Sequence, residues 1–183
     1  MRKGNSIRTV LVIFAVLGAS LMFLAPQPAQ RPLRIGTYDS RAIPIAYAFS
    51  EIGAREMRDF EDQYRKAKAA GDEKLIKELE AKAIRQHQAQ MVQAFSPASV
   101  AQILEKVKSD LPKVAKEAGV DLIVSQWDLV YYDRSAEVVD VTSGLVKLFN
   151  PREAAYKTIE EIRKQAPVPL AEAIAQAAEE GKN

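Results

Sequence analysis

The sequence contains no cysteine and only one histidine, and each scarcity excludes a class of function. Without cysteine, the chain has no disulfide, no thiol nucleophile and no cysteine-based metal site. The single histidine, His87, has no partner at the spacing that a metal site or an acid–base pair needs. No serine lies in a nucleophile-elbow context, and no phosphate loop of the Gly-x-x-x-x-Gly-Lys-Ser/Thr type occurs. We therefore expect no catalytic residue, no metal, no cofactor and no enzymatic activity.

A charge excess of one sign is also missing outside the N-terminus. The chain holds 26 Lys and Arg against 24 Asp and Glu, but Arg2, Lys3 and Arg8 lie in residues 1–30, which contain no acid. The remaining residues are therefore almost neutral, and nothing in them indicates binding to nucleic acid.

One long hydrophobic run exists, from Thr9 to Ala25, directly after the N-terminal positive charges. As a helix it would span about 25 Å, close to the thickness of the hydrocarbon core of a bilayer. The residues around Ala25 do not distinguish a cleaved signal peptide from a retained anchor, and a buried core helix is a third interpretation. Both export interpretations place the rest of the chain in the periplasm, with inner-membrane association through residues 9–25 if the segment is kept. Residues 1–30 are thus predicted to be a signal peptide or an N-terminal membrane anchor.

Helical periodicity dominates residues 44–118. Apolar residues recur every three or four positions from Pro44 to Ala70, in a heptad seam made of Gly53, Met57, Phe60, Tyr64 and Ala67. Gly71 ends this helix, and a second helix is expected from Glu73 to Phe95, with Leu75, Leu79, Ala83 and Met91 roughly on one side. The pattern predicts an antiparallel helical hairpin in which the apolar faces of the two helices are buried against each other.

A further helix is expected from Ser96, as its N-cap, to Ala118. Pro112 lies inside this run and should kink it, and Gly119 should end it.

Short strands are predicted on both sides of the helical region, near 34–40, 120–125 and 129–133, with a further one at 136–141. The segment 120–125 is almost wholly apolar, so both its faces should be covered. Two or three short strands are not stable by themselves in water. Segment 34–40 is therefore expected to pair with 120–125 across the helical insertion. The predicted fold class is therefore α+β, with a small β head (33–43 and 119–149) and a long inserted α-helical hairpin or coiled-coil arm (44–118). The side chains expected in the head sheet or at an oligomer contact are Ile35, Tyr38, Leu122, Val124 and Tyr131.

Five aspartates and the single tryptophan gather in this head. A carboxylate pair is one interpretation of the aspartates, but turns and helix caps use aspartate for local hydrogen bonds, which we favour for Asp39, Asp121, Asp128, Asp133 and Asp140. Packing in the head is favoured over ligand stacking for Trp127.

Three segments together resemble the Skp/OmpH family of periplasmic chaperones. They are "IGTYDSRAI" near the start of the body, "KAAGDEKLIKELEAKAIRQ" at the tip of the hairpin, and "AGVDLIVSQWDLVYYDRSAEVVDVTSGLVKLF", which is the most specific. The resemblance covers about residues 33–149 and assigns 31–149 to a Skp/OmpH-like domain. It implies a homotrimer with a small β body, whose helical arms surround a cavity that holds unfolded outer-membrane β-barrel proteins without ATP.

The chain departs from the family pattern in three ways. The helical limbs are unequal, so the surplus after Ser96 is expected to fold back beside the head and shorten the arms to about 40 Å. The near-neutral body weakens electrostatic capture of clients. Residues 150–183 lie beyond the resemblance and are predicted to be a loosely attached C-terminal helical extension.

An ATP-independent periplasmic holdase is the leading functional hypothesis. Its candidate client-binding residues, which the pattern equally favours as hairpin core, are Met57, Phe60, Tyr64, Leu75, Leu79 and Met91. The alternative hypothesis is a membrane-anchored structural coiled coil of the cell envelope, a stalk-like scaffold, although such a stalk has no use for strands at 120–133.

Overall fold

The computed structural model describes residues 31–181, and the described residues from Pro32 onward form one compact unit. The predicted signal peptide or membrane anchor at 1–30 lies outside the described residues. Within the described part of the chain, no helix is long and apolar enough to cross a membrane.

The head contains a three-stranded parallel sheet with β1 (Arg34–Tyr38) in the middle. Its neighbours are β2 (Leu122–Ser125) and β3 (Glu137–Asp140), in the order β2-β1-β3. Ile35 pairs with Leu122, and Thr37 pairs with Val124. The expected pairing of 34–40 with 120–125 across the whole helical insertion is therefore confirmed.

The strand expected at 129–133 is wrong, and the short strand at 136–141 is the one that forms. Strand β1 pairs with β2 on one edge and with β3 on the other, so neither edge of β1 is free for 129–133. Residues 126–136 instead form a loop, in which Asp133 Oδ1 accepts hydrogen bonds from the backbone N–H (2.8 Å) and the hydroxyl (2.6 Å) of Ser135. Tyr131 lies in this loop and is 80% exposed, so it is not part of the sheet.

Only one face of the sheet is covered by helices. Gly36 lies on the covered face, where a Cβ would stand 3.0 Å from Val120 Cγ2 and 3.2 Å from Val141 Cγ1, so a side chain there would push its neighbours aside. On the opposite face Ile35 lies between Leu122 and Val138, each 41% exposed. The expectation that both faces of 120–125 are covered is therefore wrong, because Leu122, on the face opposite Gly36, remains exposed.

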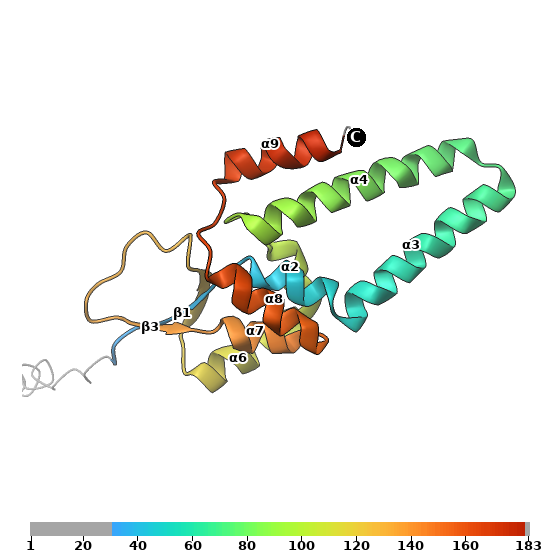
Figure 1. The fold of residues 1–183 in the computed structure, drawn as a ribbon. Coiled ribbons are helices and arrows are strands. Elements are labelled where there is room, and N and C mark those ends of the chain that lie inside the picture. Colours follow the sequence, from blue (N-terminus) through green and yellow to red (C-terminus); the bar gives the residue numbers. More distant parts are fainter. Residues whose placement is uncertain (1–30, 182–183) are drawn as a thin grey trace, which may run out of the picture. The chain divides into compact units, whose positions relative to one another are not determined.

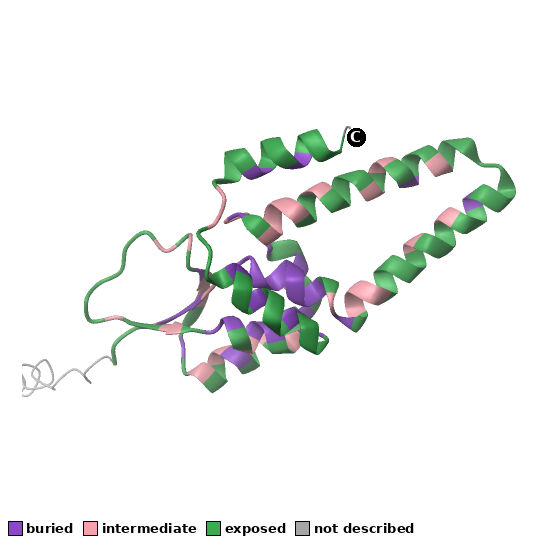
Figure 2. Ribbon diagram, in the orientation of Figure 1, coloured by how far each residue is buried: buried purple, intermediate pink, exposed green. Residues whose placement is uncertain are grey.

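The core packs around a short, almost fully buried helix, α2 (Ala42–Ala48). It contacts α7 (Thr142–Leu148) and α8 (Glu153–Arg163), and the Tyr47 ring meets the Phe149 ring edge-on at 6.4 Å. Figure 2 shows burial concentrated in this region. Since α8 buries Ala155, Ile159 and Ile162 in the core, the division predicted at residue 149 does not separate a loose extension from the head.

The predicted helix from Pro44 to Ala70 is two helices, α2 and α3 (Glu51–Ala70), because Ser50 starts a new one. The Ser50 hydroxyl accepts from the backbone N–H of Gly53 at 3.1 Å, which is the usual role of serine at a helix N-cap. Gly71 ends α3 in the left-handed conformation (φ 66°), and Asp72 caps α4 (Glu73–Phe95). The predicted turn between the two long helices is confirmed.

The expected helix from Ser96 to Ala118 is broken into three pieces. These are α5 (Ala101–Leu104), a 3-10 helix (Glu105–Asp110) and α6 (Leu111–Ala118), with the interruption at Val107 rather than at Pro112. Pro112 lies in the first turn of α6, where its missing N–H has no partner to lose. Ser96 is the C-cap of α4 and not an N-cap, and its hydroxyl donates to the Val92 carbonyl at 2.6 Å.

Helices α3 and α4 meet near their turn and part toward the head, and a C-terminal helix, α9 (Leu170–Glu180), lies beside α4 (Figure 1). The continuous heptad seam along α3 is not observed. Ala67, near the turn, is its one fully buried member, whereas Met57 is 56% exposed.

Candidate functional site

Helices α3 and α4 together form the arm of the folded protein. Its distal part is held by a small contact close to the turn. Ala67 and Leu79 are buried there, and the Tyr64 hydroxyl donates to Glu80 Oε1 at 2.7 Å. The Tyr64 ring also stacks on Phe60, with the ring centroids 6.5 Å apart. These contacts are local, so they fix the tip without closing the space between the two helices further down.

The six candidate client-binding residues therefore lie in different surroundings. Leu79 is buried between the two limbs, whereas Met57 and Leu75 are exposed on the arm. The other three, Phe60, Tyr64 and Met91, are half-buried. The arm thus presents apolar side chains to solvent along both helices, instead of burying all of them in its own seam.

The base of the arm is tied to the head by a polar cluster. The Tyr47 hydroxyl donates to Glu56 Oε2 at 2.6 Å, and Lys106 Nζ lies 2.6 Å from Glu56 Oε1 and 5.4 Å from the centre of the Tyr47 ring. Burial, followed by the hydrogen bond to Glu56, raises the pKa of Tyr47. Burial alone would raise the pKa of Glu56, but the hydrogen bonds from Lys106 and Tyr47 lower it. The cluster orients α3 where it leaves the core.

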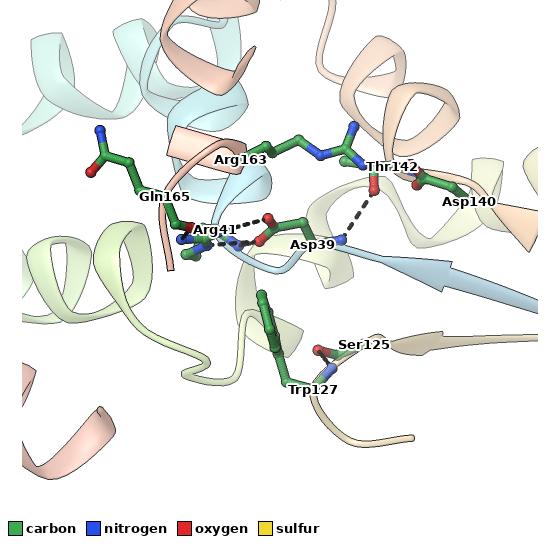
Figure 3. A network of polar contacts seen from close by, with 8 residues as sticks. All are labelled: Asp39, Arg41, Ser125, Trp127, Asp140, Thr142, Arg163 and Gln165. Carbon is green, nitrogen blue, oxygen red and sulfur yellow. Dashed lines mark hydrogen bonds and ion pairs between the residues drawn. The ribbon is translucent and has the colours of Figure 1, made fainter. Parts of the chain in front are cut away.

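The head contains a buried ion pair that sequence reasoning did not single out (Figure 3). Arg41 donates through Nε to Asp39 Oδ1 at 3.0 Å and through Nη2 to Asp39 Oδ2 at 2.8 Å, and both side chains are almost inaccessible. Arg41 Nη1 donates to the Gln165 carbonyl at 3.0 Å, and the guanidinium lies 5.3 Å from the centre of the Trp127 ring. The Asp39 backbone N–H donates to Thr142 Oγ1 at 3.0 Å. The pair therefore joins the end of β1 to the start of α7, the end of α8 and the loop after β2.

The available signal for this pair was a charged residue next to a wholly apolar helix. Arg41 directly precedes "AIPIAYA", and an arginine that is buried beside an apolar helix needs an ion-pair partner. Trp127 packs in the head as expected, and its buried Nε1 has no hydrogen-bond partner among the described residues.

Three aspartates of the head have hydrogen-bond or ion-pair partners within it. Both oxygens of Asp39 are bound by Arg41, and Asp121 accepts from the backbone N–H of Arg34 at 3.0 Å. Asp140 accepts from the backbone N–H of Thr142 at 2.9 Å and forms an ion pair with Arg163. Burial would raise the pKa of Asp140, but these bonds lower it. Asp39 and Asp140 thus make the local hydrogen bonds that the favoured interpretation expected, whereas Asp121 is bonded to Arg34, which is distant in the chain.

No metal centre is found in residues 31–181, which contain no group of three or more His, Asp or Glu side chains placed to hold an ion. His87 is exposed on α4, which agrees with its interpretation as a solvated residue. Burial, with a smaller contribution from Asp128, raises the pKa of Tyr38 at the end of β1.

The head also exposes apolar side chains. Leu122 and Val138 lie on the open face of the sheet, and the loop after β2 adds Val130, Tyr131 and Tyr132. Exposed apolar side chains mark an interaction surface when they form one contiguous patch, whereas scattered ones are common on monomers.

Comparisons of the chain with protein-family models, curated proteins and solved structures give no match. The resemblance to the Skp/OmpH family therefore rests on the sequence motifs alone, and function has to be argued from the arm and the head.

Proposed function

We propose that the protein is an ATP-independent holdase chaperone of the periplasm, which binds unfolded outer-membrane β-barrel proteins between and along α3 and α4. The observation that carries the proposal is the arm itself. Its two longest helices part from their turn and expose apolar side chains such as Met57 and Leu75, which a closed coiled coil would bury. Unfolded clients expose apolar segments of many sequences, so a wide surface of weak apolar contacts suits them better than one deep pocket.

The sheet favours this proposal over a stalk-like scaffold. A structural coiled coil needs continuous helix, whereas this arm is inserted between β1 and β2 and is anchored in a packed α/β head. The periplasmic location remains part of the proposal and rests on the export pattern of residues 1–30.

The head is proposed to assemble the protein into a homotrimer. Two edge strands whose outer edges are unpaired, with Leu122 and Val138 exposed beside them, are aggregation-prone unless something covers them, and a second and third copy would do so. Deleting residues 66–78 and closing the gap with a short turn should leave the oligomer intact, because those residues lie at the tip of the arm. Loss of the oligomer while the head remains folded would contradict this assignment.

The holdase proposal is tested by the aggregation of a urea-diluted outer-membrane β-barrel protein, followed by light scattering with residues 32–183 present. The double variant Met57→Ser/Leu75→Ser should need several-fold more protein for half-maximal suppression. The matched control, Gln63→Ser/Lys77→Ser, changes two exposed polar residues on the same helices and should behave as the parent.

The dependence of suppression on salt provides a second test. Because the body is near neutral, suppression should change little between low and high ionic strength. Strong loss with salt would reveal electrostatic capture by a local basic surface, such as the one around Arg65, Lys66 and Lys68. Absence of suppression by the parent would favour the scaffold instead.

A further inference from the structure

The C-terminal helix α9 lies antiparallel to α4 in a regular register. Gln88 Nε2 donates to the Ala177 carbonyl at 3.1 Å, and a Cβ at position 181 would lie 3.4 Å from Ile84 Cγ2. Near the other end of α9, the Val168 N–H donates to the Phe95 carbonyl at 2.9 Å. Residues later in α4 contact residues earlier in α9, as in an antiparallel pair. Helix α9 therefore covers one continuous face of α4 (Figure 1).

This contact is shallow. The buried residues of α9 are Ala173 and Ala177, each 5% exposed, and alanine contributes only a methyl group. The larger apolar residues, Leu170 and Ile174, remain about half exposed. A groove of about 330 Å³ remains beside the seam, lined by residues that include Ala89, Val92 and Ile174. A helix whose only buried side chains are two alanines has little apolar burial to resist its release, and the hydrogen bond from Gln88 adds only a modest contribution.

The tether of α9 allows such a release without disturbing the core. Residues 166–169, "APVP", contain two prolines and no helix, so they connect α8 to α9 as an extended linker. The core contact of this region, from Arg41 to the Gln165 carbonyl, precedes the linker. Undocking α9 would therefore leave α8 and the buried ion pair in place.

The face under α9 is distinct from the face that α4 turns to α3. Ile84, Gln88 and Val92 are four residues apart and form one stripe, and Gln88 lies half a turn around the helix from Leu79, which packs in the hairpin. The stripe is bordered by the exposed Phe95. Freed of α9, α4 would present apolar surface on a second side.

We propose that α9 is an intramolecular competitor that occupies the outer face of α4 and yields it to apolar segments of an unfolded client. This inference rests on the proposed function, since it names how the same arm is regulated. A tethered segment competes at the high effective concentration that its short linker gives it, so it lowers the apparent client affinity by the fraction of molecules in which α4 is free. The weak seam keeps that fraction appreciable, and a client with larger apolar side chains than alanine displaces α9.

The test compares two double substitutions on α9 in residues 32–183. Ala173→Lys/Ala177→Lys places two charges in the seam and should undock the helix. The matched control, Ala171→Lys/Ala175→Lys, adds the same charges at two exposed alanines of the same helix and should leave it docked. In the light-scattering assay the undocked variant should need at least threefold less protein than the control for half-maximal suppression, and amides of 84–95 should exchange faster in that variant alone.

A disulfide that holds α9 on α4, and that reduction releases, tests the opposite change. The protein has no other cysteine, so Ile84→Cys/Gly181→Cys can form only the one intramolecular disulfide, and the Gln88 side chain has to shift to admit the new Cβ. The oxidised form should suppress aggregation less than the same protein after reduction.

The outcomes separate the two proposals. If the lysine control and the reduced disulfide variant suppress aggregation, but undocking gives no gain and the disulfide no loss, the competitor role of α9 is overturned and the holdase proposal stands. If neither the control nor the reduced protein suppresses aggregation, the holdase proposal falls and the competitor role falls with it.

Discussion

The head and the arm of this protein are built in opposite ways. The head buries α2 almost completely and locks a charged pair inside, whereas α3 and α4 bury little besides Ala67 and Leu79. Stability is therefore concentrated in the head, and the arm is a surface held out from it. A fold divided in this way can lose or change arm contacts, as a binding surface must, without unfolding.

The largest effect on this comparison should come from breaking the buried ion pair. Arg41→Ala leaves the Asp39 carboxylate buried and uncompensated, which should lower the free energy of unfolding by about 3–5 kcal/mol in urea denaturation. The matched arm variant, Arg58→Ala, removes an exposed partner of Glu51 and should not change the midpoint measurably. Equal losses from both variants would mean that stability is shared between head and arm.

Leucine truncation should show the same contrast. Leu145 is fully buried beside α2, so Leu145→Ala should cost about 2–5 kcal/mol of unfolding free energy. Leu75 is exposed near the arm tip, so Leu75→Ala should cost less than about 0.5 kcal/mol. Urea titrations followed by circular dichroism measure both, and a costly Leu75→Ala would show that the arm contributes to the cooperative unit.

The open face of the sheet should separate stability from assembly. Leu122→Asp adds a charge at an edge position that is 41% exposed, so the unfolding free energy of the protomer should fall by only about 1 kcal/mol. The same charge on a face covered by other copies should dissociate the oligomer in sedimentation velocity, whereas Gln126→Asp, in the following loop, should not. An unchanged oligomer would place the interface elsewhere.

The smallest effects should come from pH. The native pKa values of Asp140 and Glu56 are lowered by their hydrogen bonds despite the opposing effect of burial. A lowered native pKa gives stability that is present above the unfolded-state pKa and is lost as pH falls through the native value. With Asp140→Asn, the unfolding free energy of the head should fall less steeply as the pH is lowered. With Glu56→Gln, amide protection at the start of α3 should depend less on acid pH. Acid limbs identical to the parent in both variants would remove these two carboxylates from the account.

The parts of the fold that follow from local rules could be read from the sequence. The turn at Gly71 and Asp72, the end of α6 at Gly119 and the return of 34–40 to 120–125 all depend on capping chemistry or on the need of a strand for a partner. Resemblance to a family named the function to test, and nothing in the fold alone would have named it.

The parts that failed depend on competition between segments distant in the chain. A pattern could not show that 137–140 would take the second edge of β1 from 129–133, since both segments are short and contain residues that favour strands. The heptad residues of α3 could not reveal that α4 diverges and offers another face to α9, because the seam presumes a partner along its whole length. Arg41 was missed because its significance comes from Asp39 and Gln165 together, which meet only in the folded head.

The central claim, that the head assembles and the arm holds clients, is tested most directly by one paired measurement on residues 32–183 with and without residues 66–78. Both proteins are examined for oligomer mass by sedimentation velocity and for suppression of aggregation of a urea-diluted outer-membrane β-barrel protein. The account predicts the same oligomeric state for both and suppression by the intact arm alone. Equal suppression by the shortened protein, or an intact arm that suppresses nothing, would contradict it.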